Sequence, residues 1–268
     1  MKKKIFIILI SLILFFSGKI MAQAVKLADE PVNMTDITII YDNYKFTDGT
    51  EPDWGFSCLV EVDGKNILFD TGTKPQILTK NAGIIGVDFS DVDQIIISHN
   101  HGDHTGGLRA VLSKKPGLNV YIPYPPDRGL EELTEGSGGN AASYDKPYQV
   151  TEHSWTSGTM GDQIREQCLV IEHEKGLVVI AGCSHPGIAD MLAKVKKDFN
   201  RDIYAVMGGF HLMNHSKKQI QGIIDEFNDL GVKKCGCTHC TGEKQIQQFR
   251  EAYGADFMEM GTGRKIKI

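Results

Sequence analysis

The stretch Ser98-His99-Asn100-His101-Gly102-Asp103-His104-Thr105-Gly106-Gly107 decides how the rest of this chain is interpreted. It follows the apolar run Ile95-Ile96-Ile97, which predicts a buried strand ending where the histidines begin. Residues two apart on an extended segment point the same way, so His99 and His101 can direct two imidazoles at one ion. Asp103 and His104 follow as the chain turns and can reach a second ion. Imidazole and carboxylate ligands suit zinc, iron or manganese, so the stretch predicts a metal site rather than solvated surface histidines.

Four further segments place a reactive side chain just after a strand-like apolar run. They deliver Asp70, His185, His211 and His239. Functional loops lie at strand ends in layered α/β folds, so these side chains are expected at the same edge as residues 99–104. A single histidine after a strand is more often a satisfied core residue, but the joint pattern favours a shared site. His153, His173 and His215 lack this context and are predicted to be surface residues.

Strands and helices alternate along the chain. Strands are expected at 36–41, 56–62, 66–70, 94–98, 119–123, 167–172, 176–181, 203–207 and 233–237, and helices at 75–82, 106–112, 188–199, 217–230 and 243–253. Hairpins near the start of each half, followed by strand-helix alternation, predict two sheets with helices outside.

The stretch 124–163 is rich in Gly, Ser, Pro and Thr and carries Tyr144, Tyr148 and Trp155. Long connections with little periodicity are usually functional or disordered. Because the aromatic side chains can pack on a substrate, we interpret this stretch as a lid, with a floppy insertion as the alternative.

Length and charge restrict the function. The chain has 268 residues and a formal net charge of −5, which argues against nucleic acid or another highly charged partner. A small-molecule substrate is therefore expected. The oligomeric state is left open.

The first 24 residues have the pattern of a signal peptide. Lys2-Lys3-Lys4 precedes an apolar stretch at 5–16 that is short for a membrane span, and Ala22-Gln23-Ala24 fits a cleavage site. We expect a periplasmic or secreted protein with one domain at 25–268 and no membrane attachment after cleavage. An uncleaved anchor helix is the alternative.

Six cysteines are compatible with an oxidising compartment, but their spacing selects no disulfide pairing. Cys58, Cys168 and Cys183 are expected to be buried free thiols. Cys235, Cys237 and Cys240 surround His239, yet their spacing is tighter than in common zinc knuckles, which argues against a separate thiolate site.

The chain resembles the metallo-β-lactamase superfamily, whose characteristic motif is the His-x-His-x-Asp-His loop, present here at 99–104. Further motifs resemble the branch named for 7,8-dihydropterin-6-yl-methyl-4-(β-D-ribofuranosyl)aminobenzene 5'-phosphate synthase. They are Leu68-Phe69-Asp70-Thr71-Gly72, Gly182-Cys183-Ser184-His185-Pro186-Gly187, Gly208-Gly209-Phe210-His211-Leu212, Thr238-His239-Cys240-Thr241-Gly242 and Gly261-Thr262-Gly263. The resemblance implies an α/β fold, a four-layer αβ/βα sandwich with metals at one edge between the sheets.

The resemblance also implies two divalent metal ions, with zinc favoured over manganese or iron. The first would be bound by His99, His101 and His185, and the second by Asp103, His104 and His239. Asp70 would orient a ligand through a hydrogen bond. Two departures stand out. A bridging Asp found in many superfamily hydrolases is missing, so His211 ligates, His211 contacts substrate, or water bridges alone. The branch also often has His where this chain has Trp54.

The expected activity is hydrolysis of a small ester, phosphoester or related substrate by a metal-bound hydroxide. Asp103 would orient the hydroxide, and His211 would donate a hydrogen bond or transfer a proton. Three alternatives stay open: a periplasmic zinc β-lactamase, a pterin-type transferase, and a di-iron redox enzyme.

Overall fold

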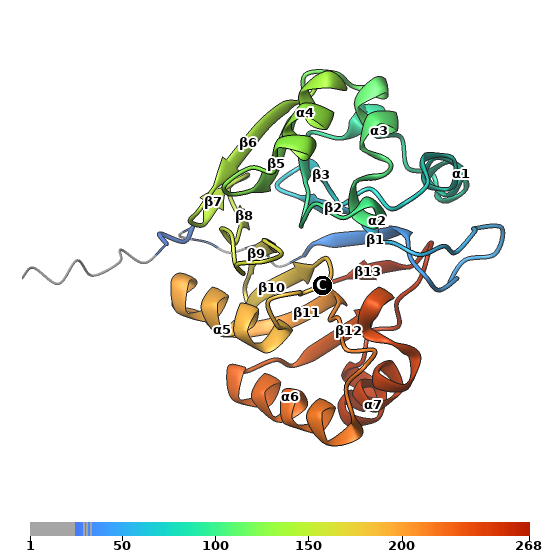
Figure 1. The fold of residues 1–268 in the computed structure, drawn as a ribbon. Helices are drawn as coiled ribbons and strands as arrows, with labels where there is room; N and C mark the ends of the chain where they lie inside the picture. Colours follow the sequence, from blue (N-terminus) through green and yellow to red (C-terminus); the bar gives the residue numbers. More distant parts are fainter. Residues whose placement is uncertain (1–24, 29, 31, 33) are drawn as a thin grey trace, which may run out of the picture.

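The computed structural model describes residues 25–28, 30, 32 and 34–268, and the predicted signal peptide lies outside these residues. Two β-sheets lie face to face, with helices on both outer sides (Figure 1). This arrangement confirms the predicted four-layer αβ/βα sandwich. Among the described residues, no helix has the length and apolar character needed to cross a membrane.

The N-terminal sheet has the strand order β13-β1-β2-β3-β4-β5-β6. These strands are β1 (Asp36–Tyr41), β2 (Ser57–Val62), β3 (Lys65–Phe69), β4 (Gln94–Ile96), β5 (Asn119–Pro123), β6 (Asn140–Tyr144) and β13 (Lys265–Lys267). The predicted first hairpin is present, with β2 antiparallel to β3. From β3 to β6 the strands are parallel, so the loops that follow β3 and β4 leave the same edge.

The C-terminal sheet has the order β12-β11-β10-β9-β8-β7. Its strands are β7 (Tyr148–Gln149), β8 (Ser154–Thr156), β9 (Leu169–His173), β10 (Gly176–Ala181), β11 (Ile203–Gly209) and β12 (Lys234–Thr238). The predicted second hairpin is the antiparallel pair β9–β10. Strands β10, β11 and β12 are parallel, which brings the loops carrying His185, His211 and His239 to one edge.

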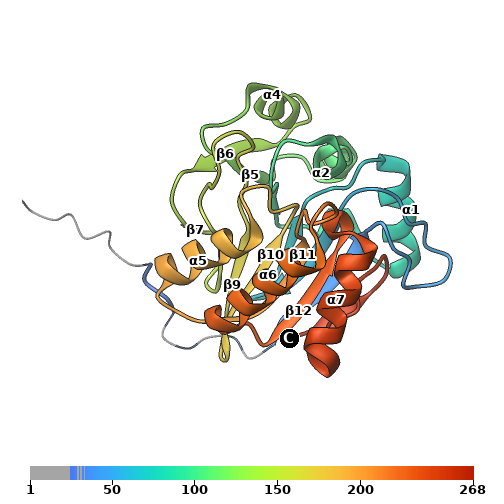
Figure 2. The same ribbon diagram turned by 60° about the horizontal axis from the view of Figure 1, so that its bottom comes forward.

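The helices cover the outer faces of the two sheets. They are α1 (Pro75–Ile85), α2 (Gly102–Thr105), α3 (Leu108–Lys114), α4 (Arg128–Gly136), α5 (Ile188–Phe199), α6 (Lys217–Leu230) and α7 (Glu243–Tyr253), with short 3-10 turns η1 (Phe89–Asp91), η2 (His239–Thr241) and η3 (Gly254–Asp256). Figure 2 shows α5, α6 and α7 lying across the C-terminal sheet. An apolar layer that includes Phe69 and Met207 fills the space between the sheets.

The helix expected at 106–112 corresponds to α3, which spans 108–114, and the short helix α2 precedes it. Gly106 and Gly107 separate the two helices, and here the backbone approaches the loop after β3. A Cβ atom on Gly106 would lie 1.9 Å from the carbonyl oxygen of Thr73, so only glycine fits this contact. Asp103 and His104 lie on α2 rather than on the turn that the sequence predicted.

The stretch 124–163 contains more regular structure than its composition suggests. It includes α4, the edge strand β6 of one sheet, and the edge strand β7 of the other sheet with its neighbour β8. Tyr144 and Tyr148 stack face to face, with ring centroids 3.7 Å apart. They lie where the chain crosses from β6 of one sheet to β7 of the other. Movement of this segment as a lid stays a prediction.

Two of the three histidines predicted at the surface are buried, so those predictions are wrong. His153 is 8% exposed and pairs with Asp63, and His173 is 2% exposed and stacks on Tyr204. Both acquire their partners from distant segments. His215 is half-buried. All six cysteines are buried free thiols, including the three around His239.

Candidate metal centre

Two groups of metal-ligating side chains lie where strands of both sheets end. The first contains His99, His101 and His185, and the second contains Asp103, His104, Cys183 and His239. Within each group the ligand atoms lie within 4.8 Å of one another. The rings of His99 and His104 are 4.2 Å apart, so the groups are neighbours. The structure therefore brings together all six residues that the sequence predicted as ligands.

Four residues around the groups have left-handed backbones. Asp70, Ser184, His211 and His239 have φ values of 57°, 64°, 54° and 51°. This conformation is unfavourable for residues other than glycine and concentrates at functional sites. These residues follow β3, β10, β11 and β12, where the backbone leaves each strand.

Asp70 connects two of the histidines. Its Oδ2 lies 2.6 Å from Nδ1 of His104 and accepts a hydrogen bond from the hydroxyl of Ser98 at 2.7 Å. The Ser98 hydroxyl also lies 2.8 Å from Nδ1 of His99. With their Nδ1 atoms occupied, both imidazoles keep Nε2 for another partner.

Glu166 supports His185 in the same way, a role for which no sequence motif exists. The fully buried carboxylate accepts hydrogen bonds from the backbone amides of Cys183, Ser184 and His185 at 2.8–2.9 Å. It also lies 2.9 Å from Nδ1 of His185. Burial alone would raise the pKa of Glu166, but the contact with His185 and the neighbouring His99 lower it well below the usual range. Glu166 therefore holds the turn as a carboxylate.

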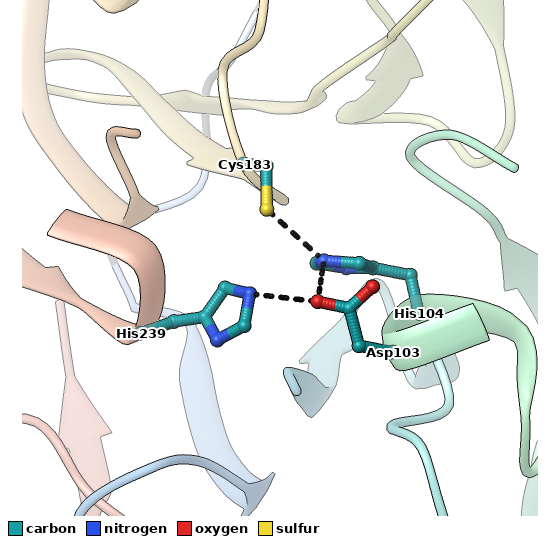
Figure 3. Close-up of side chains that lie close together, drawn as sticks. All are labelled: Asp103, His104, Cys183 and His239. Carbon is teal, nitrogen blue, oxygen red and sulfur yellow. Dashed lines mark hydrogen bonds and ion pairs between the residues drawn. The ribbon is translucent and has the colours of Figure 1, made fainter. Parts of the chain in front are cut away.

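Asn43 holds His239. Its Oδ1 lies 2.9 Å from Nδ1 of His239, and its Nδ2 donates a hydrogen bond to the His239 carbonyl. Nε2 of His239 is buried without a hydrogen-bond partner, and the nearest carboxylate oxygen, Oδ2 of Asp103, is 3.4 Å away (Figure 3). A buried imidazole nitrogen is rarely left unpaired. This orphaned atom and the surrounding donor set fit a divalent metal ion.

Trp54 occupies the position at which the resembled branch often has His. Its indole Nε1 donates a hydrogen bond of 2.8 Å to Oδ2 of Asp103, and its ring lies 4.9 Å from that of His239. Trp54 is 46% exposed, so its side chain orients Asp103 from the solvent side.

The surroundings keep the central histidines neutral. Burial, followed by the charge of His104, lowers the pKa of His99 to about 3. Burial and the neighbouring His239 lower the pKa of His104 to about 3 as well. Burial raises the pKa of Asp70 to about 7. Neutral imidazole is the form that coordinates metal, so both histidines are ready to bind at pH 7.

His211 lies beside the first group rather than in it. Its ring is 4.5 Å from that of His185, and its ligand nitrogen groups with the thiols of Cys183 and Cys240. The hydrogen bond with Cys240 raises the pKa of His211. His185 and His211 both line an open cleft of about 1120 Å³, which residues 159–165 also line. A small molecule in this cleft would contact the first group.

Comparisons with known proteins agree with this geometry. Residues 52–181 match the model of the metallo-beta-lactamase superfamily. The chain is 31% identical to the 7,8-dihydropterin-6-methyl-4-(beta-D-ribofuranosyl)-aminobenzene-5'-phosphate synthase of Methanocaldococcus jannaschii, over 80% of this chain and 90% of that protein. It resembles the crystal structure of Tm1679, described as a metal-dependent hydrolase of the beta-lactamase superfamily, with a TM-score of 0.73, 28% identity and coverage of 87% and 99%. The fold is also shared with YhfI from Bacillus subtilis, with a TM-score of 0.66, 14% identity and the same coverage.

Proposed function

The chain belongs to the metallo-β-lactamase superfamily and is a metal-dependent hydrolase, and we propose that it holds two zinc ions and hydrolyses a small ester or phosphoester. The observation that carries this proposal is the pair of adjacent ligand groups, one of which opens on a cleft through His185. Metal chemistry at this position has direct access to a bound small molecule.

The ligand roles follow from the geometry. His99, His101 and His185 would hold one ion, and Asp103, His104 and His239 would hold the other. Divalent cations there supply a Lewis acid and lower the pKa of water, from about 15.7 to about 7 for zinc. Asp70, Glu166 and Asn43 fix the ring orientations through the Nδ1 contacts described above. Such partners of metal-bound histidines also raise ligand basicity.

Two residues are proposed to act on the reactants directly. Asp103 orients the attacking water, because its carboxylate stands at the second group and is itself held by Trp54. His211 lines the cleft beside His185 and donates a hydrogen bond or a proton to the substrate. His211 is therefore assigned to the substrate rather than to a metal.

The cleft offers charged groups of both signs. Arg165 and Lys194 can meet a phosphate, while Asp145, Asp162 and Asp190 can meet hydroxyl or amino groups. This favours a polar substrate such as a phosphoester. A second candidate, transfer of a pterin to a phosphoribosyl-type acceptor, is supported by the name of the Methanocaldococcus jannaschii relative.

We also propose that the protein is exported, on the strength of the basic start and short apolar stretch of residues 1–16. Amino-terminal sequencing of the protein purified from the periplasm or medium tests this. A first residue of Val25 is expected. Full-length protein retained in the cytoplasm contradicts the proposal.

A substrate panel tests the activity. Zinc-loaded enzyme is assayed with phosphodiesters, phosphomonoesters, lactones, thioesters and the β-lactam nitrocefin. Turnover of an ester or phosphoester that is lost in His101→Ala supports the proposal. Turnover of nitrocefin alone would establish a β-lactamase instead, and a pterin-transfer assay with no hydrolysis of any ester would favour the transferase.

A further inference from the structure

One strong metal ligand at the site has no role in the function proposed above. Cys183 follows β10 directly and is 3% exposed, and its Sγ lies 3.2 Å from Nε2 of His104 (Figure 3). The sulfur belongs to the same group as Asp103, His104 and His239. The four residues come from three separate segments, so their convergence is a property of the fold rather than of one loop.

A thiol hydrogen bond to His104 explains only part of this arrangement. It accounts for the 3.2 Å contact, but Nε2 of His239 stays buried without a hydrogen bond, 3.4 Å from Oδ2 of Asp103. A cation among the four atoms satisfies the sulfur and the orphaned nitrogen together. The position of the Cys183 sulfur and the buried Nε2 of His239 therefore both indicate a bound cation.

We propose that Cys183 is the fourth protein ligand of the second metal ion, together with Asp103, His104 and His239. Zinc bonds of about 2.3 Å to sulfur and about 2.0 Å to nitrogen or oxygen place two tetrahedral ligands about 3.3–3.6 Å apart. The observed separations are 3.2 Å from His104 Nε2 to Cys183 Sγ, 3.6 Å from His104 Nε2 to Asp103 Oδ2, and 3.4 Å from His239 Nε2 to Asp103 Oδ2. On binding, the thiol releases its proton to solvent.

The inference rests on the proposed dinuclear site. It gives the two ions different numbers of protein ligands. Four protein ligands close a zinc site, whereas three leave a position open. The second ion is then enclosed by protein, and the ion held by His99, His101 and His185 keeps the open position. His185 is the ligand of that group that lines the cleft. A thiolate also favours zinc over manganese, because soft sulfur ligands select softer ions.

Cys240 is the matched control. It is also 3% exposed, its Sγ approaches the Cys183 carbonyl oxygen at 3.6 Å, and it groups with Cys183 and His211. It is not part of the group that contains Asp103 and His239. Replacing it removes a buried thiol from the same neighbourhood while leaving the proposed ligand in place.

The test is zinc X-ray absorption spectroscopy of the full chain loaded with zinc alone, as wild type, Cys183→Ser and Cys240→Ser. We expect about one sulfur neighbour for every two zinc ions, at about 2.3 Å, in wild type and Cys240→Ser. We expect none in Cys183→Ser. The cobalt-loaded proteins should follow the same pattern, with a sulfur-to-cobalt charge-transfer band lost only in Cys183→Ser.

Wild type that binds two zinc ions with only nitrogen and oxygen neighbours overturns the role of Cys183 and leaves the dinuclear hydrolase intact. Loss of sulfur in Cys240→Ser, with sulfur retained in Cys183→Ser, overturns it too. Wild type that binds no zinc overturns the proposed function as well. If Cys183→Ser fails to fold, the wild-type and Cys240→Ser spectra still show whether a sulfur other than that of Cys240 binds zinc.

Discussion

Oε2 of Glu166 lies 2.9 Å from Nδ1 of His185, and the same carboxylate accepts the amides of residues 183–185. One buried side chain thus orients a proposed ligand and folds the turn that carries it. A glutamate with this role has no motif of its own, because its partners lie 17–19 residues away in sequence.

Replacing Glu166 with Ala should weaken both the fold and metal binding. Several buried donors lose their acceptor, at about 1–3 kcal/mol for an unsatisfied group, so urea unfolding should show a loss of about 2–4 kcal/mol. Zinc affinity of the first group should fall about 10–100-fold, as for other residues that orient metal-bound histidines. Glu166→Gln, which keeps an acceptor oxygen, should lie between wild type and Glu166→Ala. Unchanged zinc affinity in a folded Glu166→Ala variant would contradict this role.

Trp54→Phe should affect the second group while leaving the fold intact. The change removes the indole N–H that binds Asp103 but keeps an aromatic ring beside His239. Because Trp54 is 46% exposed, unfolding should change by no more than about 0.5 kcal/mol. We expect weaker zinc binding by titration, and Trp54→His should restore it in part through an imidazole N–H. Equal zinc affinity in all three proteins would show that the hydrogen bond to Asp103 does not contribute to zinc binding.

His211→Ala should lower kcat by about 10²–10⁴-fold without loss of bound metal, if His211 acts on the substrate as a proton or hydrogen-bond donor. His211 lines the cleft and lies outside both groups of predicted ligands. Elemental analysis and steady-state kinetics on the same sample separate the two roles. Loss of one metal ion in His211→Ala would make His211 a ligand instead.

The fold and the cluster of ligands could be predicted because their signals are local. Alternating strand and helix patterns indicated both sheets, and the histidines follow strands that turn out to be parallel neighbours. Glu166, Asn43 and Trp54 could not be predicted, since each acquires its role only when a distant segment folds against it. The same reason explains His153, which looked exposed and is buried against Asp63 from the β2–β3 turn.

The His153–Asp63 pair should make stability depend on pH. Burial lowers the pKa of His153, but the hydrogen bonds with Asp63 and with the Glu30 carbonyl, together with the charge of Asp63, raise it overall. Its contribution is therefore complete below about pH 6.5, the unfolded value, and is lost as pH rises through the higher folded pKa. Burial would raise the pKa of Asp63, but hydrogen bonds from Thr151 and His153 lower it, so its contribution is present above about pH 3.9 and is lost in stronger acid.

Asp63→Asn tests this pair, and asparagine tolerates the left-handed backbone at this position, where φ is 57°. The variant should be about 1–3 kcal/mol less stable than wild type near pH 5.5, with a smaller difference near pH 8.5. Urea unfolding at both pH values measures the gap. A difference that does not change with pH would show that the pair is not ionised in the folded protein.

We propose that hydrolysis depends on two ions held by the histidine and aspartate groups. Elemental analysis of the purified protein, together with turnover of an ester or phosphoester before and after chelation, is the decisive measurement. We predict about two zinc ions per chain, loss of turnover when they are removed, and recovery when zinc is returned. Full turnover in the metal-free protein, or in a His101→Ala variant, would show that hydrolysis does not depend on the bound metal ions.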